Sequence, residues 1–322
     1  MPGCPIQRRL LGLWLFLWII VGLLAGCGGI QRAESPARPA NIPVAIELEA
    51  VPFFPQNKYQ CGPSTLAMAL TYSDLPVTPE ALQSQVYTPS RKGSLQTAMV
   101  GAARRQGRIA YPVAGLDSIW PELAAGHPVI VLQNLGLSWI PVWHYALVIG
   151  YNFADDSVFL RSGITARKVM SLYTFEKTWA RSDYWGILVL KPTQMPVTGR
   201  QTDYLAAVLG LEKARQFQAA VEGYQTALTR WPESLIALMG LGNSLYALGD
   251  LYGAEDAFRT ATMTHPREAG AYNNLAQVLM EQGRLPEALE AAQKAVAIGG
   301  AMREIYESTL KEIQSKQKQF LR

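Results

Sequence analysis

The 322-residue sequence has few of the side chains from which metal sites, disulfide frameworks and nucleic-acid interfaces are built. It contains only three cysteines and three histidines, and its formal net charge is +4. The histidines are scattered along the chain and cannot form a metal site with so few thiols, which argues against a metallopeptidase. The weak charge gives no basic footprint for nucleic acid. We therefore expect no metal, no cofactor and no nucleic-acid partner.

Long apolar runs are also few, and the one that stands out covers residues 10–26, directly after Arg8 and Arg9. A basic segment, an apolar run and small residues in this order are typical of a signal peptide. The Leu-Ala-Gly-Cys sequence at residues 24–27 resembles a bacterial lipobox. We expect residues 1–26 to be a lipoprotein signal peptide and Cys27 to be lipidated. A retained membrane-spanning helix is the alternative, although a run of about 17 residues is short for one.

The lipidated cysteine would be followed by Gly28 rather than an aspartate. By analogy with Gram-negative sorting, this favours a periplasm-facing lipoprotein of the outer membrane, in the bacterial cell envelope. Residues 27–45 are expected to be a tether between the anchor and the first domain. With Cys4 removed and Cys27 acylated, Cys61 is the only thiol left. A single unpaired thiol in an exported protein favours a reactive role.

Cys61 stands at a point where an extended, proline-containing stretch gives way to an apolar run with helical spacing. A thiol in the first turn of a helix lies near unpaired backbone N–H groups and the positive end of the helix dipole, which stabilise a thiolate. Gln56, five residues upstream, could donate an amide hydrogen bond near the same sulfur. The alternative is a small buried core cysteine.

His144 opens an apolar and β-branched run, residues 143–151, that predicts a buried strand. An imidazole at the start of a core strand is rigidly held, as a general base for a cysteine must be. The alternative is a core histidine that is satisfied by its neighbours.

Three groups of residues together resemble the papain-like cysteine peptidases that remove double-glycine leaders from bacteriocins. They are Gln56, the Tyr-Gln-Cys-Gly-Pro-Ser element at residues 59–64, and His144-Tyr145 followed by Val-Ile-Gly-Tyr at residues 148–151. The resemblance covers residues 46–192. It implies an α+β papain-like fold, with Cys61 as nucleophile, His144 as general base and Gln56 as oxyanion-hole donor.

The same resemblance implies an aspartate at the end of the strand after the histidine strand, and here Ser162 occupies that place. A hydroxyl can accept the imidazole N–H, but it cannot stabilise an imidazolium as a carboxylate does. Asp155 and Asp156 are close in sequence, but a hairpin turn would point them at solvent.

The order of elements in this region indicates an α+β domain, with helices first and an antiparallel sheet after them. We expect helices after Cys61, from Gly93 and in residues 119–125 and 173–179. We expect strands at residues 128–133, 144–151, 158–161 and 185–190. This places the nucleophile on a helix and the base on the sheet, on the two sides of a cleft.

Beyond a linker at residues 193–200, the sequence repeats with a period of 34 residues, as the alanines at 220, 254 and 288 show. The period and the pattern of small residues resemble tetratricopeptide repeats. We expect three helix pairs over residues 201–300 and a polar capping helix at 301–322. Unrelated amphipathic helices are the alternative. Such repeats bind partners by default, so a peptide or protein partner is expected here.

The sequence thus predicts a lipid-anchored cysteine peptidase that works through a thioacyl intermediate and carries a repeat module for protein or peptide binding. Two other functions use the same features. One is an inactive papain-like domain in a scaffold that binds partners through its repeats. The other is acyl transfer or amidase chemistry at the Cys61–His144 site.

Overall fold

The structure is a computed structural model that describes residues 38–56 and 59–320. The predicted signal peptide and the predicted lipidation site, Cys27, lie outside the described residues. Among the residues that are described, no helix combines the length and apolar character needed to span a bilayer.

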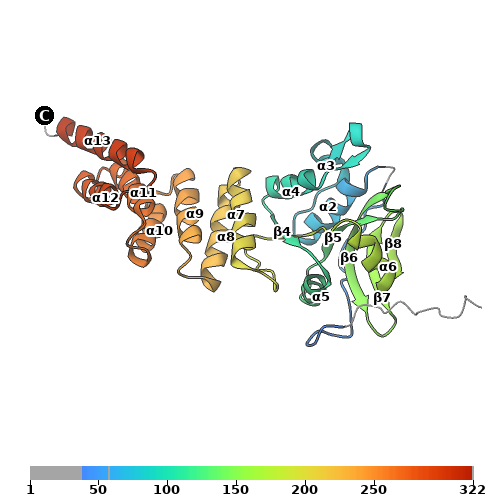
Figure 1. The fold of residues 1–322 in the computed structure, drawn as a ribbon. Coiled ribbons are helices and arrows are strands. Elements are labelled where there is room, and N and C mark those ends of the chain that lie inside the picture. Colours follow the sequence, from blue (N-terminus) through green and yellow to red (C-terminus); the bar gives the residue numbers. More distant parts are fainter. Residues whose placement is uncertain (1–37, 57–58, 321–322) are drawn as a thin grey trace, which may run out of the picture. The chain divides into compact units, whose positions relative to one another are not determined.

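The N-terminal domain is built on a seven-stranded antiparallel sheet (Figure 1). Its strand order is β4-β9-β5-β6-β7-β8, and β1 pairs with β6. The strands are β1 Ala45–Glu47, β4 Ile109–Val113, β5 Val129–Asn134, β6 Trp143–Asn152, β7 Ser157–Ser162, β8 Thr165–Ser171 and β9 Gly186–Leu190. The two central strands β5 and β6 have almost entirely buried side chains, so both faces of the sheet are covered.

Five helices cover this sheet, and the alternation of strand side chains divides them between its two faces. They are α2 Cys61–Tyr72, α3 Pro79–Val86, α4 Gln96–Arg105, α5 Leu116–Ala124 and α6 Leu172–Ala180. Ile130 and Leu132 belong to the core that includes α2, α3 and α4, whereas Val129 and Val131 belong to the core of α5 and α6. The sheet is therefore the middle layer, and α2 lies against the face opposite α5.

A short hairpin interrupts the helical side between α3 and α4. It consists of β2 Tyr87–Thr88, a 3-10 turn Pro89–Arg91, and β3 Gly93–Ser94. Lys92 lies at its tip with φ 47°, in the left-handed region. The helix predicted to begin at Gly93 begins instead at Gln96, because the two residues at 93 and 94 pair with β2.

The C-terminal region is all-helical. Its helices are α7 Gln201–Lys213, α8 Phe217–Arg230, α9 Leu235–Ala247, α10 Leu251–Thr264, α11 Ala269–Glu281, α12 Leu285–Ile298 and α13 Arg303–Phe320. The alanines at 220, 254 and 288 are fully buried where helices pack. Gly240 is required by the close approach of α8, since a Cβ there would lie 2.2 Å from the ring of Tyr224. The α+β domain followed by a helical repeat region confirms the fold class predicted from the sequence.

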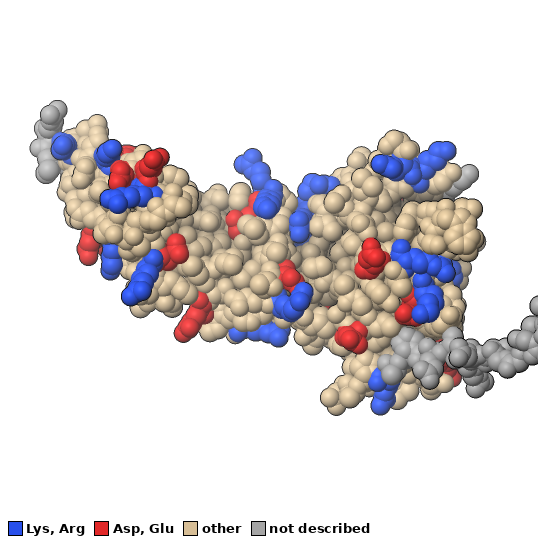
Figure 2. Space-filling view, in the orientation of Figure 1, with Lys and Arg blue, Asp and Glu red and all other residues tan. Residues whose placement is uncertain are grey.

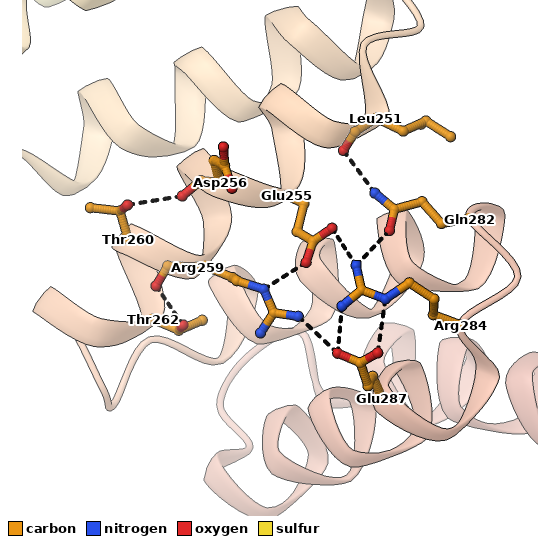
Figure 3. Close-up of polar contacts among 9 residues, drawn as sticks. All are labelled: Leu251, Glu255, Asp256, Arg259, Thr260, Thr262, Gln282, Arg284 and Glu287. Carbon is orange, nitrogen blue, oxygen red and sulfur yellow. Dashed lines mark hydrogen bonds and ion pairs between the residues drawn. The ribbon is translucent and has the colours of Figure 1, made fainter.

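A charged cluster joins two successive helix pairs of this region (Figure 3). Glu255 of α10 accepts hydrogen bonds from Arg259 at 2.7 Å and from Arg284 at 2.6 Å, and both arginines also contact Glu287. Burial raises the pKa of Glu255, but the hydrogen bonds from Arg284 and Arg259 outweigh it and bring the pKa down to about 2. The carboxylate is therefore charged at every physiological pH.

The segment between the two regions is held to the N-terminal domain by Glu122. This fully buried carboxylate accepts hydrogen bonds from the backbone N–H and the hydroxyl of Thr198, at 2.7 and 2.6 Å, and contacts His127 at 2.7 Å. The Tyr204 hydroxyl of α7 donates to the carbonyls of Pro192 and Gln194. The linker is thus fixed at both ends by buried polar groups.

Candidate functional site

A cleft of about 840 Å³ opens between the helical side of the N-terminal domain and the sheet, and Gln56, Cys61 and His144 all line it. This volume is within the usual range for ligand sites, roughly 300–1,000 Å³. The structure therefore brings together three of the four residues predicted as catalytic in one cavity. The fourth, Ser162, is buried behind His144.

Cys61 is the first residue of α2 and is half-buried. The backbone N–H groups of Tyr145, Gly62 and Cys61 itself act on its sulfur to lower the pKa of the thiol. Burial is the largest effect on the thiol, and it raises the pKa of Cys61 above its ordinary value. The N–H groups act in the opposite direction. We expected the helix start to stabilise a thiolate, but removal of the sulfur from water is the stronger effect in this structure.

His144 is held at the cleft end of β6 by a hydrogen bond of 2.8 Å between its Nε2 and the hydroxyl of Ser162 on the neighbouring strand β7. Burial, together with the nearby Lys168 ammonium, lowers the pKa of His144 to about 4. The imidazole is therefore neutral at pH 7. Because Ser162 occupies Nε2, the nitrogen that remains for proton transfer is Nδ1.

Ser162 can either donate to an imidazole nitrogen or accept from it, whereas an ionised carboxylate can only accept. An accepting partner keeps the proton on Nε2 and leaves the lone pair on Nδ1, which is the form that can take a proton from a thiol. With a hydroxyl at this position, both tautomers are satisfied. Ser162 thus holds the ring in place but does not select the reactive tautomer.

Gln56 is nearly buried, and its side-chain amide is partly engaged. Its Nε2 donates to the hydroxyl of Thr65 at 3.2 Å, and that hydroxyl donates to the carbonyl of Tyr145 at 3.3 Å. Its backbone N–H donates to Gly163 in the β7–β8 turn at 3.0 Å. A primary amide has two N–H groups, so one of them remains for an oxyanion after the contact with Thr65. In the described part of the chain, the buried Oε1 of Gln56 has no hydrogen-bond partner.

Sequence reasoning missed three groups around the cysteine. The Tyr145 N–H reaches the sulfur because it follows His144 on β6. Thr65 lies one turn into α2 and links Gln56 to the sheet. Ser94 packs so closely on Gly62 that a Cβ at that glycine would lie 2.2 Å from its hydroxyl. In the sequence, the contact with Ser94 is indicated only by the glycine that follows Cys61.

Neutral thiol and neutral imidazole are the resting states of Cys61 and His144 at pH 7, because burial moves both pKa values in the direction that removes charge. A thiolate–imidazolium pair is therefore not the ground state. Nucleophilic attack at this site requires the proton to leave the sulfur as the new bond forms. The hydrogen bonds of the backbone N–H groups to the sulfur favour that transfer.

Comparison with protein families gives two matches. Residues 48–186 match the Peptidase_C39 like family, and residues 205–263 and 253–302 match a tetratricopeptide repeat family. The first match contains Gln56, Cys61, His144 and Ser162. A search of the curated proteins found no match to this chain.

Several solved structures are similar to part of this chain. A C39-like peptidase from Bacillus anthracis is 18% identical, with a TM-score of 0.40, covering 46% of this chain and 98% of that one. The tetratricopeptide domain of Sgt2 from Aspergillus fumigatus is 19% identical, with a TM-score of 0.35, covering 38% of this chain and 81% of that one. The Yersinia enterocolitica type III secretion translocator chaperone SycD is 16% identical, with a TM-score of 0.35, covering 36% and 85%.

Proposed function

We propose that this chain, which carries a C39-like domain followed by tetratricopeptide repeats, is a cysteine peptidase with Cys61 as nucleophile and His144 as general base. One observation carries the proposal. The thiol at the start of α2 and the imidazole at the start of β6 line one cleft, and the ring is fixed through Nε2 by Ser162. A sulfur, a base and a positioning group around one cleft support nucleophilic catalysis.

In the proposed reaction, the Cys61 sulfur attacks the carbonyl carbon of a peptide bond while Nδ1 of His144 takes the thiol proton. The carbonyl oxygen becomes an oxyanion, stabilised by the backbone N–H of Cys61 and the second N–H of Gln56. Each such donor contributes about 3 kcal/mol by analogy with measured oxyanion holes. The imidazolium then gives its proton to the leaving amine, and a thioester remains on the sulfur. Water hydrolyses the thioester with His144 again as base.

A second candidate function is peptide capture without cleavage, and the electrostatics of the site support it. A neutral thiol beside a neutral imidazole, with a hydroxyl in place of a carboxylate, transfers its proton less readily than a thiolate–imidazolium pair. Such a pair would leave the cleft able to bind a peptide without cleaving it. Acyl transfer or amidase chemistry would use the same residues as the peptidase reaction and differ from it only in the acceptor.

Capture of a thioester distinguishes these functions. The chain from residue 38 onward would be incubated with a peptide mixture derived from bacterial envelope proteins, quenched in acid and analysed by intact mass spectrometry. A mass adduct on Cys61 that disappears in the His144→Ala variant, together with newly formed peptide termini, supports a peptidase. An amine acceptor incorporated into products indicates acyl transfer. Binding with neither adduct nor cleavage refutes catalysis.

We further propose that the protein is held in the bacterial cell envelope, with its domains facing the periplasm, by acyl chains on Cys27, and that the outer membrane is its site. The support is the signal-peptide pattern and the residues around Cys27. Incorporation of a labelled fatty acid into the wild-type chain but not into a Cys27→Ser variant tests the anchor. Fractionation of inner and outer membranes tests the location.

The repeats are proposed to bind a protein or peptide partner, as tetratricopeptide domains generally do. They would hold that partner close to the cleft and so raise its local concentration there. A pull-down with a chain that lacks residues 235–320 but keeps α7 and α8, compared with the intact chain, would show whether the partner depends on the repeats.

A further inference from the structure

The two sides of the cleft differ in chemistry. On the helical side, the tip of the β2–β3 hairpin places Arg91 and Lys92 at the cleft, both exposed. In the described part of the chain, neither side chain has a hydrogen-bond or ion-pair partner. On the face drawn in Figure 2, lysine and arginine side chains gather over this hairpin, beyond α3. These two cations are therefore available to a ligand.

On the sheet side, Val142 and Trp143 line the cleft next to His144, and they are 54% and 50% exposed. Half-exposed large apolar side chains at the wall of a cavity lose contact with water only when a ligand covers them. Trp143 is moreover held in position, because β6 pairs it with Asn134 of β5. The wall is thus a fixed apolar surface.

Two other charged groups line the cleft, Arg181 and Asp183. Arg181 donates to the carbonyls of Asn134 and Gly136, at 3.1 and 2.8 Å, so it is engaged in holding the β5–β6 loop. Asp183 lies on this same side, after α6. The negative charge in the cleft is therefore on the sheet side, and the unpaired positive charge is on the hairpin.

We infer that the cleft selects a peptide segment carrying an acidic side chain for Arg91 and Lys92 and a large apolar side chain for Trp143, on either side of the residue that meets Cys61. The inference rests on the proposed function, because it treats the cleft as the substrate site. The positions of the charged and apolar residues on either side of Cys61 and His144 support it directly. Ser94, two residues from Lys92, packs against Gly62 next to Cys61, and Trp143 is adjacent to His144.

The test uses binding, so that it does not depend on catalysis. The chain from residue 38 onward with Cys61→Ala would be titrated with fluorescein-labelled glycine-serine peptides that contain one Glu and one Phe, at varied spacing and in both orders. Parallel peptides replace Glu by Gln or Phe by Ala. Binding would be followed by fluorescence anisotropy at low and at high salt.

We expect the best Glu–Phe peptide to bind about fivefold more tightly than its Gln counterpart at low salt, since exposed ion pairs contribute up to about 1 kcal/mol each, and this preference should shrink at high salt. Replacing Phe by Ala should weaken binding about tenfold. The double variant Arg91→Glu/Lys92→Glu should abolish or reverse the preference for Glu. Trp143→Ala should abolish the preference for Phe.

Each variant has a matched control on the same chain. Lys311→Glu/Lys318→Glu reverses two exposed cations on α13, away from the cleft, and should leave the preference for Glu intact. Trp139→Ala removes an exposed tryptophan of the β5–β6 loop, four residues before Trp143, that does not line the cleft, and should leave the preference for Phe intact.

Equal binding of Glu and Gln peptides overturns the inference, as does a preference for Glu that survives reversal of Arg91 and Lys92. The proposed function can be wrong while the inference is right, and the reverse also holds. If selectivity is as expected but the same peptides are never cleaved by the chain with Cys61 intact, the cleft is a peptide-binding site and the inference stands. If cleavage occurs without selectivity, the inference alone is wrong.

Discussion

Replacement of Ser162 by aspartate should convert the neutral pair of Cys61 and His144 into a more reactive one. The change places a carboxylate where a hydroxyl now meets Nε2 at 2.8 Å. A carboxylate accepts the Nε2 proton, which selects the tautomer with a lone pair on Nδ1, and it stabilises the imidazolium that forms when the thiol proton is transferred. The second effect raises the pKa of His144, and both effects favour transfer of the thiol proton to Nδ1.

The size of the gain depends on two opposing contributions, the attraction between the carboxylate and the imidazolium and the cost of burying the carboxylate. Two unit charges about 4 Å apart interact by about 4 kcal/mol at the effective dielectric constant near a protein surface. Ser162 is 4% exposed, so burial of a new carboxylate cancels part of this gain, although the ammonium of Lys168 close to His144 reduces that penalty. A net gain of about 1.4–2.7 kcal/mol remains, which corresponds to roughly a 10- to 100-fold larger population of the charged pair.

The assay is the rate of alkylation of Cys61 by iodoacetamide as a function of pH. At pH 7, Ser162→Asp should react at least about tenfold faster than the wild type, and the gain should vanish when His144→Ala is added. Ser162→Asn is the matched control, because it supplies a neutral oxygen acceptor of nearly the same shape. A folded Ser162→Asp variant that is no faster than Ser162→Asn would refute the argument that the missing charge keeps the pair neutral.

Three further results are expected. Burial raises the pKa of Cys61, so the rate of its alkylation in the wild type should still increase with pH above about 8.5, the pKa of an ordinary thiol. A rate that reaches a plateau below this pH would contradict a neutral resting thiol. Gly240→Ala, whose Cβ meets the ring of Tyr224, should lower the free energy of unfolding by about 1–3 kcal/mol in urea titrations. Gly93→Ala should not, because its Cβ would make only an ordinary contact of 3.7 Å with the carbonyl oxygen of Arg91. Folding lowers the pKa of Glu255, so the ionised carboxylate stabilises the folded state above about pH 4.5, and this contribution is lost as the pH falls toward 2. Glu255→Gln should lower the free energy of unfolding by about 1–3 kcal/mol at pH 7. The free energy of unfolding of this variant should also fall less steeply with decreasing pH than that of the wild type.

Strongly periodic segments were predictable from the sequence, and weakly periodic ones were not. The strands β5, β6, β7 and β9 were predicted within a residue or two because they are apolar runs bounded by turn residues. The edge strand β8 was missed because its side chains are mostly polar and exposed, and β4 was missed because Pro112 lies inside it.

The identity of the candidate site residues could be proposed from short motifs, but their charge states could not. Whether a thiol at a helix start is ionised depends on how deeply the rest of the chain buries it, and that is a property of the packed domain. In the same way, the contact of Gln56 with Thr65 depends on how the segment before α2 meets the helix. The pairing of His144 with Ser162 was anticipated only because a resemblance supplied the expected partner.

The helix α7 belongs to both regions of the chain. It contacts β4, the terminal strand of the sheet order, and Tyr204, Leu205 and Val208 are buried in the same core as Ile109. An uncovered sheet edge invites pairing with another chain, and a helical solenoid with a bare first helix exposes apolar surface. Here α7 covers the sheet at β4, and the sheet in turn covers apolar side chains of α7. Cutting the chain at the linker would therefore expose two aggregation-prone surfaces at once, one on each fragment, and dissection of the protein should keep α7 with the sheet.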